Sequence, residues 1–160
     1  MPSDPAPKRT QQRLDLDRFI PYRLSVLTNR VSSAIARQYS DRFELSIPEW
    51  RAMAVLGGTP GLSAREVAER TAMDKVQVSR AIESLMRARR VQREADASDG
   101  RVMRLSLTPR GRAIYEEVVP LALHLEAIFL SALTPSERRT LETLLDKLSR
   151  QARLLAPRNQ

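Results

Sequence analysis

The chain has 160 residues, enough for one domain or for one lobe with an accessory lobe, and its net charge of +8 favours a polyanionic partner. It has no cysteine and one histidine, His124, which excludes disulfides, thiol redox sensing and Cys-based zinc sites and argues against a histidine-rich metal site. No apolar run approaches the roughly 18 residues that cross a bilayer and the N-terminus has no apolar signal segment, so we expect a cytoplasmic protein with no membrane partner.

The first part of the chain predicts a tail and then a long helix. Residues 1–13 hold three prolines and almost nothing apolar, so we expect a disordered tail. The alternative is a tail that touches phosphates through Lys8, Arg9 and Arg13. From Leu14 to about Phe43, apolar residues recur every three or four positions, which predicts a helix that Pro21 either kinks or starts. These residues are Leu16, Ile20, Leu24, Leu27, Val31 and Ile35.

Three shorter helices are expected next. The segment from Ile47 to Leu56 has a proline in its first turn and ends at a run of glycines beginning at Gly57. Its buried side is predicted to comprise Trp50, Met53, Ala54 and Leu56. Ser63 and Glu66 form a capping box that opens the following helix. Asp74 is the cap of another helix, which we expect to run to about Arg89. Its buried side is predicted to comprise Val78, Ile82, Leu85 and Met86.

Two short strands around a polar turn follow. Val91 to Glu94 and Val102 to Leu107 have strand-like content, and the second shows an alternation of period two. The intervening residues 96–100, DASDG, are typical of a turn. Together with the two preceding helices, this order predicts a helix-turn-helix followed by a β-wing.

The last third predicts two more helices. Thr108-Pro109 opens a long helix that Pro120 is expected to bend, and Thr134-Pro135 opens a final one. The final helix places one stripe of leucines at Leu141, Leu144, Leu145, Leu148 and Leu155. Because one small lobe cannot cover stripes of this length, we expect a homodimer, with an intramolecular three-helix bundle as the alternative. The predicted dimerisation residues are Leu16, Ile20, Leu141, Leu144, Leu145 and Leu148.

The expected fold class is mainly α with a small β-hairpin wing. Four helices precede the hairpin and two follow it. We expect a winged helix-turn-helix lobe over residues 47–111. The dimerisation region is expected at 14–46 and 112–156.

The start of the helix capped by Asp74 carries the chemistry of base recognition. Lys75, Gln77, Ser79 and Arg80 occupy its outer arc, where glutamine can bond adenine and arginine can bond guanine in a major groove. The alternative is an ordinary solvated helix face. Between residues 63 and 112, twelve Lys and Arg stand against seven Asp and Glu, an excess of five positive charges.

The polar turn carries a second candidate contact. Arg101 suits a narrow minor groove, with Asp99 holding it extended; the alternative is a loop arginine paired only with Asp96 or Asp99. The surrounding arginines suit phosphate contact. They are Arg87, Arg89, Arg90, Arg93 and Arg104. The full predicted DNA-contacting set is Ser63, Lys75, Gln77, Ser79, Arg80, Arg87, Arg93, Asp99, Arg101 and Arg104.

Ligand-binding candidates are fewer. Trp50 is interpreted as a core residue, with a ligand platform as the alternative. Arg51 is able to pair with a carboxylate ligand, with Glu49, or with nothing. His124 is interpreted as an ordinary helix histidine. We expect no cofactor. A small aromatic carboxylate or phenolic effector is the one small molecule that the sequence suggests, bound where the first long helix and the Trp50 helix meet the Pro120 helix.

The chain resembles the MarR family of winged-helix transcriptional regulators. The resemblance is carried by the 63–71 helix, by DKVQVSRAIESLMRARR, by the wing from Asp96 to Arg101 and by the exit RLSLTPRG, and it covers residues 14 to about 155. It implies an obligate homodimer on a pseudo-palindromic operator and frequent control by a small aromatic or phenolic anion. One departure is that Arg89-Arg90-Val91 stands where the family has glycine and then an apolar pair. Arg89 is therefore expected to be left-handed.

Three functions of different classes follow from the sequence. The first is a sequence-specific regulator, expected to be a ligand-responsive repressor. The second is an architectural DNA-binding protein without an effector, against which the base-reading set argues. The third is an enzyme, for which the sequence holds no nucleophile–base pair, metal cluster or phosphate loop. We therefore expect no enzymatic activity.

Overall fold

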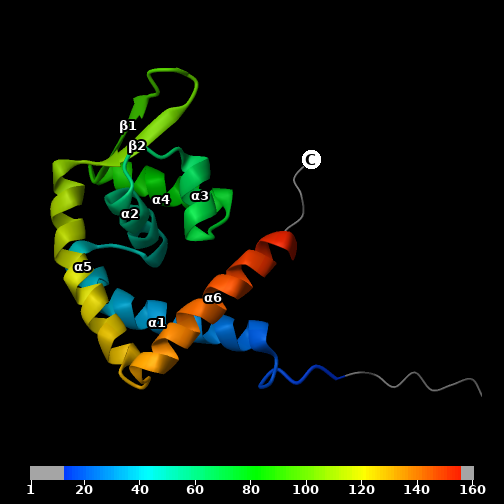
Figure 1. Cartoon of the computed structure of the whole chain (residues 1–160). Coiled ribbons are helices and arrows are strands. Elements are labelled where there is room, and N and C mark those ends of the chain that lie inside the picture. The colour runs from blue at the N-terminus through cyan, green and yellow to red at the C-terminus, as the bar shows by residue number, and fades with distance from the viewer. Residues whose placement is uncertain (1–12, 156–160) are drawn as a thin grey trace, which may run out of the picture.

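The computed structural model describes residues 13–155, which form six helices and one hairpin (Figure 1). The expected fold class is confirmed. The proposed tail contacts of Lys8 and Arg9, and residue 156 at the end of the expected dimerisation region, lie outside the described residues. The elements are α1 (Ile20–Phe43), α2 (Ile47–Gly58), α3 (Ala64–Thr71), α4 (Lys75–Arg87), β1 (Val91–Ala95), β2 (Met103–Leu107), α5 (Pro109–Leu130) and α6 (Pro135–Leu155).

Side-chain caps begin most of these helices. Ser46 and Ser63 each form a complete capping box with the glutamate three residues later, and Asp74 accepts from the backbone of α4. The caps predicted at Ser63, Asp74 and Thr108 are thus confirmed. Each cap satisfies backbone N–H groups that a helix start leaves without partners.

Three helix boundaries differ from the predictions, and each strand differs by one residue at one end. α1 begins at Ile20 rather than Leu14, because the proline that follows Ile20 occupies its first turn and residues 16–18 form a separate turn. α2 continues through Gly58, since the backbone N–H of Thr59 still donates to Val55 at 2.9 Å. α4 ends at Arg87, two residues early, and Arg89 adopts the left-handed conformation with φ 57°, as expected.

The core surrounds α2. Ala52, Met53 and Leu56 of this helix have no exposed surface. They pack with residues from α1, α3, α4, the wing base and α5 in one apolar cluster. The buried sides predicted for α2 and α4 are confirmed for Met53, Leu56, Val78, Ile82 and Leu85, whereas Trp50, Ala54 and Met86 are only partly buried.

The wing and the two terminal helices lie at opposite ends of the molecule (Figure 1). α5 runs between these ends, and α6 turns back from it by 109°. β1 and β2 are antiparallel, with Val91 opposite Leu107 and Ala95 opposite Met103. In the described residues no single helix is long and apolar enough to cross a membrane. Taken together, α5 and α6 have the length and composition of a membrane span, but they are bent relative to each other.

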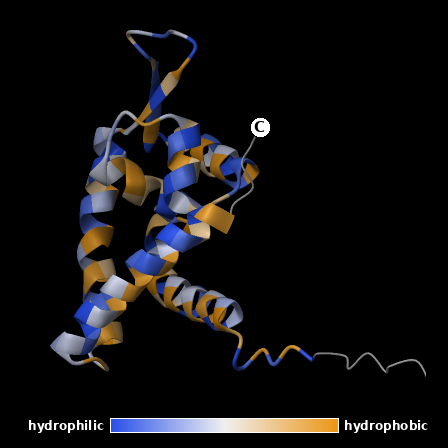
Figure 2. Ribbon diagram, turned by 45° about the vertical axis from the view of Figure 1, so that its right-hand side comes forward, coloured by the Kyte–Doolittle hydropathy of each residue, from blue (hydrophilic) through white to orange (hydrophobic). Residues whose placement is uncertain are grey.

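The terminal helices keep much of their apolar surface in contact with solvent. α6 has no buried residue, and Leu144, Leu145 and Leu148 are 44–51% exposed. Ile20, the first residue of α1, and Leu16, in the turn before it, are similarly exposed. Figure 2 shows apolar segments recurring along both helices. One copy of the chain therefore leaves these stripes uncovered.

Candidate nucleic-acid interface

The helix pair α3 and α4 is fixed by buried side chains on their facing sides. Val67 on α3 and Val78 and Leu85 on α4 have at most 1% of their surface exposed. Between the helices, Ala72 is left-handed with φ 53°, which makes the turn tight. The pair is therefore a rigid platform whose outer side is set by the apolar pattern of α4.

The outer side of α4 presents the residues expected to read bases. Lys75, Gln77, Ser79 and Arg80 are all exposed near its start. The Asp74 cap holds this end, accepting from the Gln77 backbone at 2.8 Å. Ser79 donates to Glu83 at 3.2 Å, whereas the other three side chains make no hydrogen bond within the described residues. The sequence-predicted face is thus assembled on one helix end, which is the end that enters a major groove in helix-turn-helix proteins.

Beside this face lies a polar hollow of about 320 Å³ between α4 and the start of α2. Gln77 and Arg80 form one wall, and Ser46 and Glu49 form the other. Arg80 therefore lines an open hollow and is not packed against a neighbouring helix.

The tip of the wing is built around Asp96. Its Oδ1 accepts from the Ser98 backbone at 2.8 Å and hydroxyl at 2.5 Å, and from the Asp99 backbone at 3.1 Å. The Asp96 backbone N–H donates to Val102 at 2.8 Å. Hydrogen bonds from Ser98 and Arg104 hold the pKa of the Asp96 carboxyl far below its usual range. The turn is therefore ordered by an ionised carboxylate.

Arg104 fastens the wing to α3. Its Nε donates to Asp96 at 2.6 Å, and one terminal nitrogen donates to Glu66 at 3.0 Å. Glu66 is also the carboxylate of the Ser63 capping box, and hydrogen bonds from Ser63 lower its pKa. One arginine thus joins the wing tip and the first helix of the pair, an arrangement we term the Arg104 node (Arg104, Asp96 and Glu66).

Arg101 lies at the exposed edge of the wing turn. Its backbone N–H donates to the Asp99 carboxylate at 3.0 Å. The guanidinium makes no ion pair within residues 13–155, so the expected Asp99–Arg101 pairing occurs through the backbone and not through the two charges. The Arg101 side chain is exposed to solvent at the wing turn, as a minor-groove contact requires.

Comparisons with known proteins agree with this geometry. Residues 43–102 match the model of the MarR family. The HTH-type transcriptional repressor Rv2887 of Mycobacterium tuberculosis is 30% identical over 131 residues, which cover 81% of this chain and 91% of the relative.

The chain belongs to the MarR family.

Solved structures show how far the MarR likeness extends. A probable transcriptional regulator from Pseudomonas aeruginosa is 30% identical with a TM-score of 0.71, over 84% of this chain and 99% of that one. The BpsR regulator of Bordetella bronchiseptica, whose DNA binding is described as regulated by 6-hydroxynicotinic acid, is 26% identical with a TM-score of 0.75 over 86% and 98%. MarR proteins are DNA-binding transcriptional regulators and not enzymes, so the protein is a regulator of this class.

The remaining predicted DNA-contacting residues of this MarR protein fall into two groups. Arg87, at the end of α4, and Arg93, on the wing, are both exposed. Ser63 and Arg104 are instead engaged within the protein, in the capping box and in the Arg104 node. The contacts of both residues with DNA stay a prediction. Each also has a structural role, which the sequence predicted for Ser63 and did not predict for Arg104.

The assignment of Arg90 to phosphate contact is wrong. Only 6% of this residue is exposed. Its guanidinium turns inward and donates to the backbone carbonyls of Phe43 at 2.5 Å and Glu44 at 3.2 Å. The residue type gave no sign that Arg90 is buried, because it stands in a run of arginines. Its position did give a sign, because the MarR pattern has an apolar residue there.

The ligand candidates Trp50 and Arg51 lie in a packed region. The Trp50 ring packs at a tilt against Tyr39 and Tyr115, with centroid distances of 5.6 and 6.1 Å. Arg51 donates to the Ser32 hydroxyl at 3.2 Å and not to Glu49. Burial raises the pKa of Tyr39 to about 12, against the opposing charge of Arg51. The aromatic packing favours the core interpretation of Trp50.

Sequence reasoning missed Val76 on the reading face. This side chain is 58% exposed and lies between Lys75 and Gln77 at the start of α4. An apolar group here suits the methyl group of thymine, which is the apolar feature of the major groove. The signal was present in the sequence, since Val76 falls outside the buried register of Val78, Ile82 and Leu85.

Proposed function

We propose that this MarR protein is a homodimeric repressor that binds a two-fold symmetric operator and is released by a small aromatic carboxylate. Each protomer inserts the start of α4 into a major groove and the wing into the adjacent minor groove. Two α4 helices then read half-sites about one helical turn apart. The relative Rv2887 is named as a transcriptional repressor, which supports the repressor assignment.

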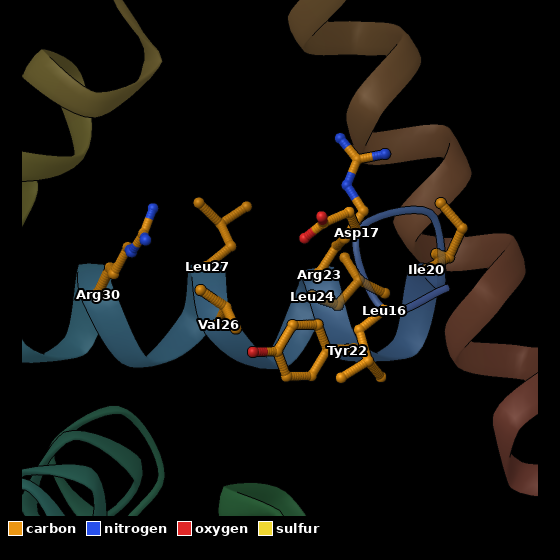
Figure 3. A pocket seen from close by; sticks show the side chains of 9 residues that line it. All are labelled: Leu16, Asp17, Ile20, Tyr22, Arg23, Leu24, Val26, Leu27 and Arg30. Atoms are coloured by element: carbon orange, nitrogen blue, oxygen red, sulfur yellow. The ribbon is translucent and has the colours of Figure 1, made fainter. Parts of the chain in front are cut away.

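The observation that carries the dimer is the uncovered leucine stripe of α6. Three of its leucines are about half exposed, although burying one leucine contributes roughly 1.5–3 kcal/mol. The start of α1 adds a hollow of about 610 Å³ whose lining includes Leu16, Ile20, Leu24 and Leu27 (Figure 3). A second copy supplies the same stripe, so an isologous pairing covers both.

The effector proposal is supported by an apolar hollow of about 320 Å³ between α1, α5 and α6. Ile35 and Phe129 provide walls for an aromatic ring, and Arg138 provides a cation, although the carboxylates of Glu126 and Glu142 also line the hollow. This differs from the predicted location near Trp50. A related regulator, BpsR, responds to 6-hydroxynicotinic acid, which is itself an aromatic carboxylate. A ligand that binds among these helices changes the separation of the two α4 helices.

The test of the dimer and the operator is selection of duplexes from a random library by the purified protein. We expect two-fold symmetric sequences, a complex of two protomers per duplex by sedimentation, and little displacement by unrelated duplex at about 150 mM salt. Selection of no symmetric sequence, with equal competition by unrelated DNA, would instead establish an architectural DNA-binding protein.

The test of the effector uses a panel of aromatic carboxylates, including 6-hydroxynicotinic acid and benzoate. Each is titrated against the operator complex and against the melting temperature of the free protein. We expect one member to release DNA and to raise the melting temperature. Release by hydrogen peroxide or a divalent metal, with no response to any organic anion, contradicts the effector proposal.

A further inference from the structure

Arg90 is the residue at which the exit of α4, the start of α5 and the end of α1 meet. Its backbone N–H donates to Leu85 of α4 at 2.8 Å. Its carbonyl accepts from the backbone of Thr108, the cap of α5, at 3.0 Å. A side chain at Gly111 would overlap that carbonyl, so glycine is required for α5 to approach so closely. The Arg90 backbone is therefore fixed between α4 and α5.

The Arg90 side chain adds the connection to α1. Its two terminal nitrogens donate to the carbonyls of Phe43 and Glu44, at the last residue of α1 and its cap. Glu44 is left-handed with φ 48°, which ends the helix there. The final carbonyls of a helix lack internal partners and carry the negative end of its dipole, so a guanidinium is a favourable cap. This cap comes from the DNA-reading part of the chain.

Stability alone does not account for an arginine at this position. The guanidinium is removed from water, and its Nε has no hydrogen-bond partner within the described residues. Burying such a charge costs free energy that an apolar side chain does not incur. Burial would also raise the pKa of nearby Glu49, but hydrogen bonds from Ser46 and Ser84 and the charge of Arg90 together lower it. Hydrogen bonds are directional and apolar contacts are not. The guanidinium donors therefore fix the end of α1 relative to α4, which an apolar side chain would not do.

We propose that Arg90 is a positioning residue that fixes the angle between α1 and the recognition helix α4, and thereby sets the half-site spacing that the dimer accepts. This inference rests on the proposed homodimer and its two-fold operator. α1 belongs to the part that pairs with the second copy, whereas α4 reads the bases. A change in their angle therefore moves the two reading faces relative to each other, without altering the contacts of either face.

The geometry of DNA makes spacing a sensitive readout. One inserted base pair separates two half-sites by a further 3.4 Å or so and rotates one by about 34°. A dimer with a fixed α1–α4 angle rejects such a duplex, whereas a dimer with a variable angle follows it. Base preference within each half-site is unaffected in both cases.

The experiment compares Arg90→Leu, Arg90→Lys and the wild type on duplexes carrying the half-sites that the wild type selects, with the spacing changed by one base pair. Arg37→Leu removes the same charge at an exposed position of α1 and serves as the control. We expect the preference for the native spacing to fall about tenfold in Arg90→Leu, with partial rescue in Arg90→Lys and no change in the control.

A measurement without DNA keeps the inference testable if Arg90→Leu binds poorly. The chain has no cysteine, so Glu83→Cys places one spin label on α4 of each protomer. We expect a narrow distance distribution between the two labels in the wild type and a broader one in Arg90→Leu and Arg90→Lys. If Arg90→Leu does not fold, the comparison of Arg90→Lys with the wild type decides the result.

The outcomes separate this inference from the proposed function. A lower melting temperature with unchanged spacing preference and an unchanged label distribution overturns the positioning role and leaves the regulator intact. Failure of the wild type to select any symmetric duplex, or to form a dimer, overturns the proposed function and the positioning role with it.

Discussion

Removing Arg80 and removing Arg101 should weaken DNA binding in different ways. Arg80 projects from the start of α4, and Arg101 projects from the exposed turn of the wing. Arg80→Ala should cost roughly 1–3 kcal/mol of binding free energy and relax the preference at one base pair per half-site. Arg101→Ala should weaken binding mainly where the flanking minor groove is narrow and rich in A·T.

Binding to the selected duplex and to random duplex, measured for both variants at one salt concentration, distinguishes these roles. The control is Arg150→Ala, an exposed arginine on α6 far along the chain from the reading face. If Arg80→Ala loses the same binding free energy on selected and on random DNA, Arg80 contacts a phosphate and not a base.

The proposed contact between Val76 and a thymine can be tested by removing one methyl group from the DNA. If its exposed side chain contacts a thymine methyl, replacing that thymine by deoxyuridine removes the contact and leaves every hydrogen bond of the base pair. The loss should be about 0.8 kcal/mol, or roughly fourfold in Kd. The same replacement should have no effect on Val76→Ala, whose affinity for both duplexes should be equal. An equal loss in the variant assigns the methyl contact to another residue.

The wing predicts a dependence on acid. The pKa of Asp96 is lowered in the folded protein, so its ionised form contributes stability that is fully present above the unfolded value near 3.9 and is lost as the pH falls through the lower folded value. Wing order, followed by NMR signals of Ser98 and Asp99, should therefore persist at about pH 4 and fail only in stronger acid. Asp96→Asn should show a disordered turn at every pH.

For single residues, the sequence predicted local features such as caps well and the distant partners of charged side chains poorly. Caps such as Ser63 and Asp74 depend on residues three positions apart, so their chemistry is visible in the sequence. Arg90 and Arg104 find partners 38 to 47 residues away. No local feature distinguishes Arg104 from Arg101, which stays exposed, and the one sign for Arg90 was its place at an apolar position of the MarR pattern.

Among the elements, α6 makes the most direct prediction. Leu144→Asp with Leu148→Asp places two charges in the stripe that we assign to the dimer. The double variant should be monomeric or unfolded, since each leucine contributes roughly 1.5–3 kcal/mol when buried. Sedimentation and circular dichroism together measure the outcome.

A charge-matched control is available on the same helix. Arg139→Gln with Arg150→Gln also lowers the net charge by two, and these residues lie opposite the leucine stripe on a helical projection. This control should remain a folded dimer. A folded dimer in the aspartate variant as well would place the interface away from α6.

Helix positions were predictable and their exact ends were not. Apolar periodicity located the long helices, because the period reflects which face meets the core, whereas caps, a first-turn proline and terminal glycines located the short ones. The start of α1 depended on whether Pro21 sits within or at the beginning of the helix, and both are compatible with the pattern. The end of α4 depended on Arg89, whose left-handed backbone is stabilised by neighbours outside the helix, including Thr108.

For the whole molecule, the uncovered stripes predict that folding and association are coupled. A dimer that buries α6 and the start of α1 should melt at a higher temperature as the protein concentration rises. Scanning calorimetry over a hundredfold range of concentration measures this. The Leu144→Asp and Leu148→Asp variant, if folded, should show no such dependence. A wild-type melting temperature that is independent of concentration contradicts the coupling.

The length of α5 has a consequence for how little movement regulation requires. A helix of 22 residues is about 33 Å long, with its first turn beside the wing, Pro120 in its middle and its last turn beside α6. Pivoting a helix of this length by about 6° at the α6 end displaces the wing end by about 3.4 Å, which is one base-pair step. A molecule the size of benzoate bound beside Phe129 therefore needs to cause only a small shift at the α6 end of α5. The same rotation moves the recognition helix of that protomer out of register with its half-site, while the packing around the ligand is little changed.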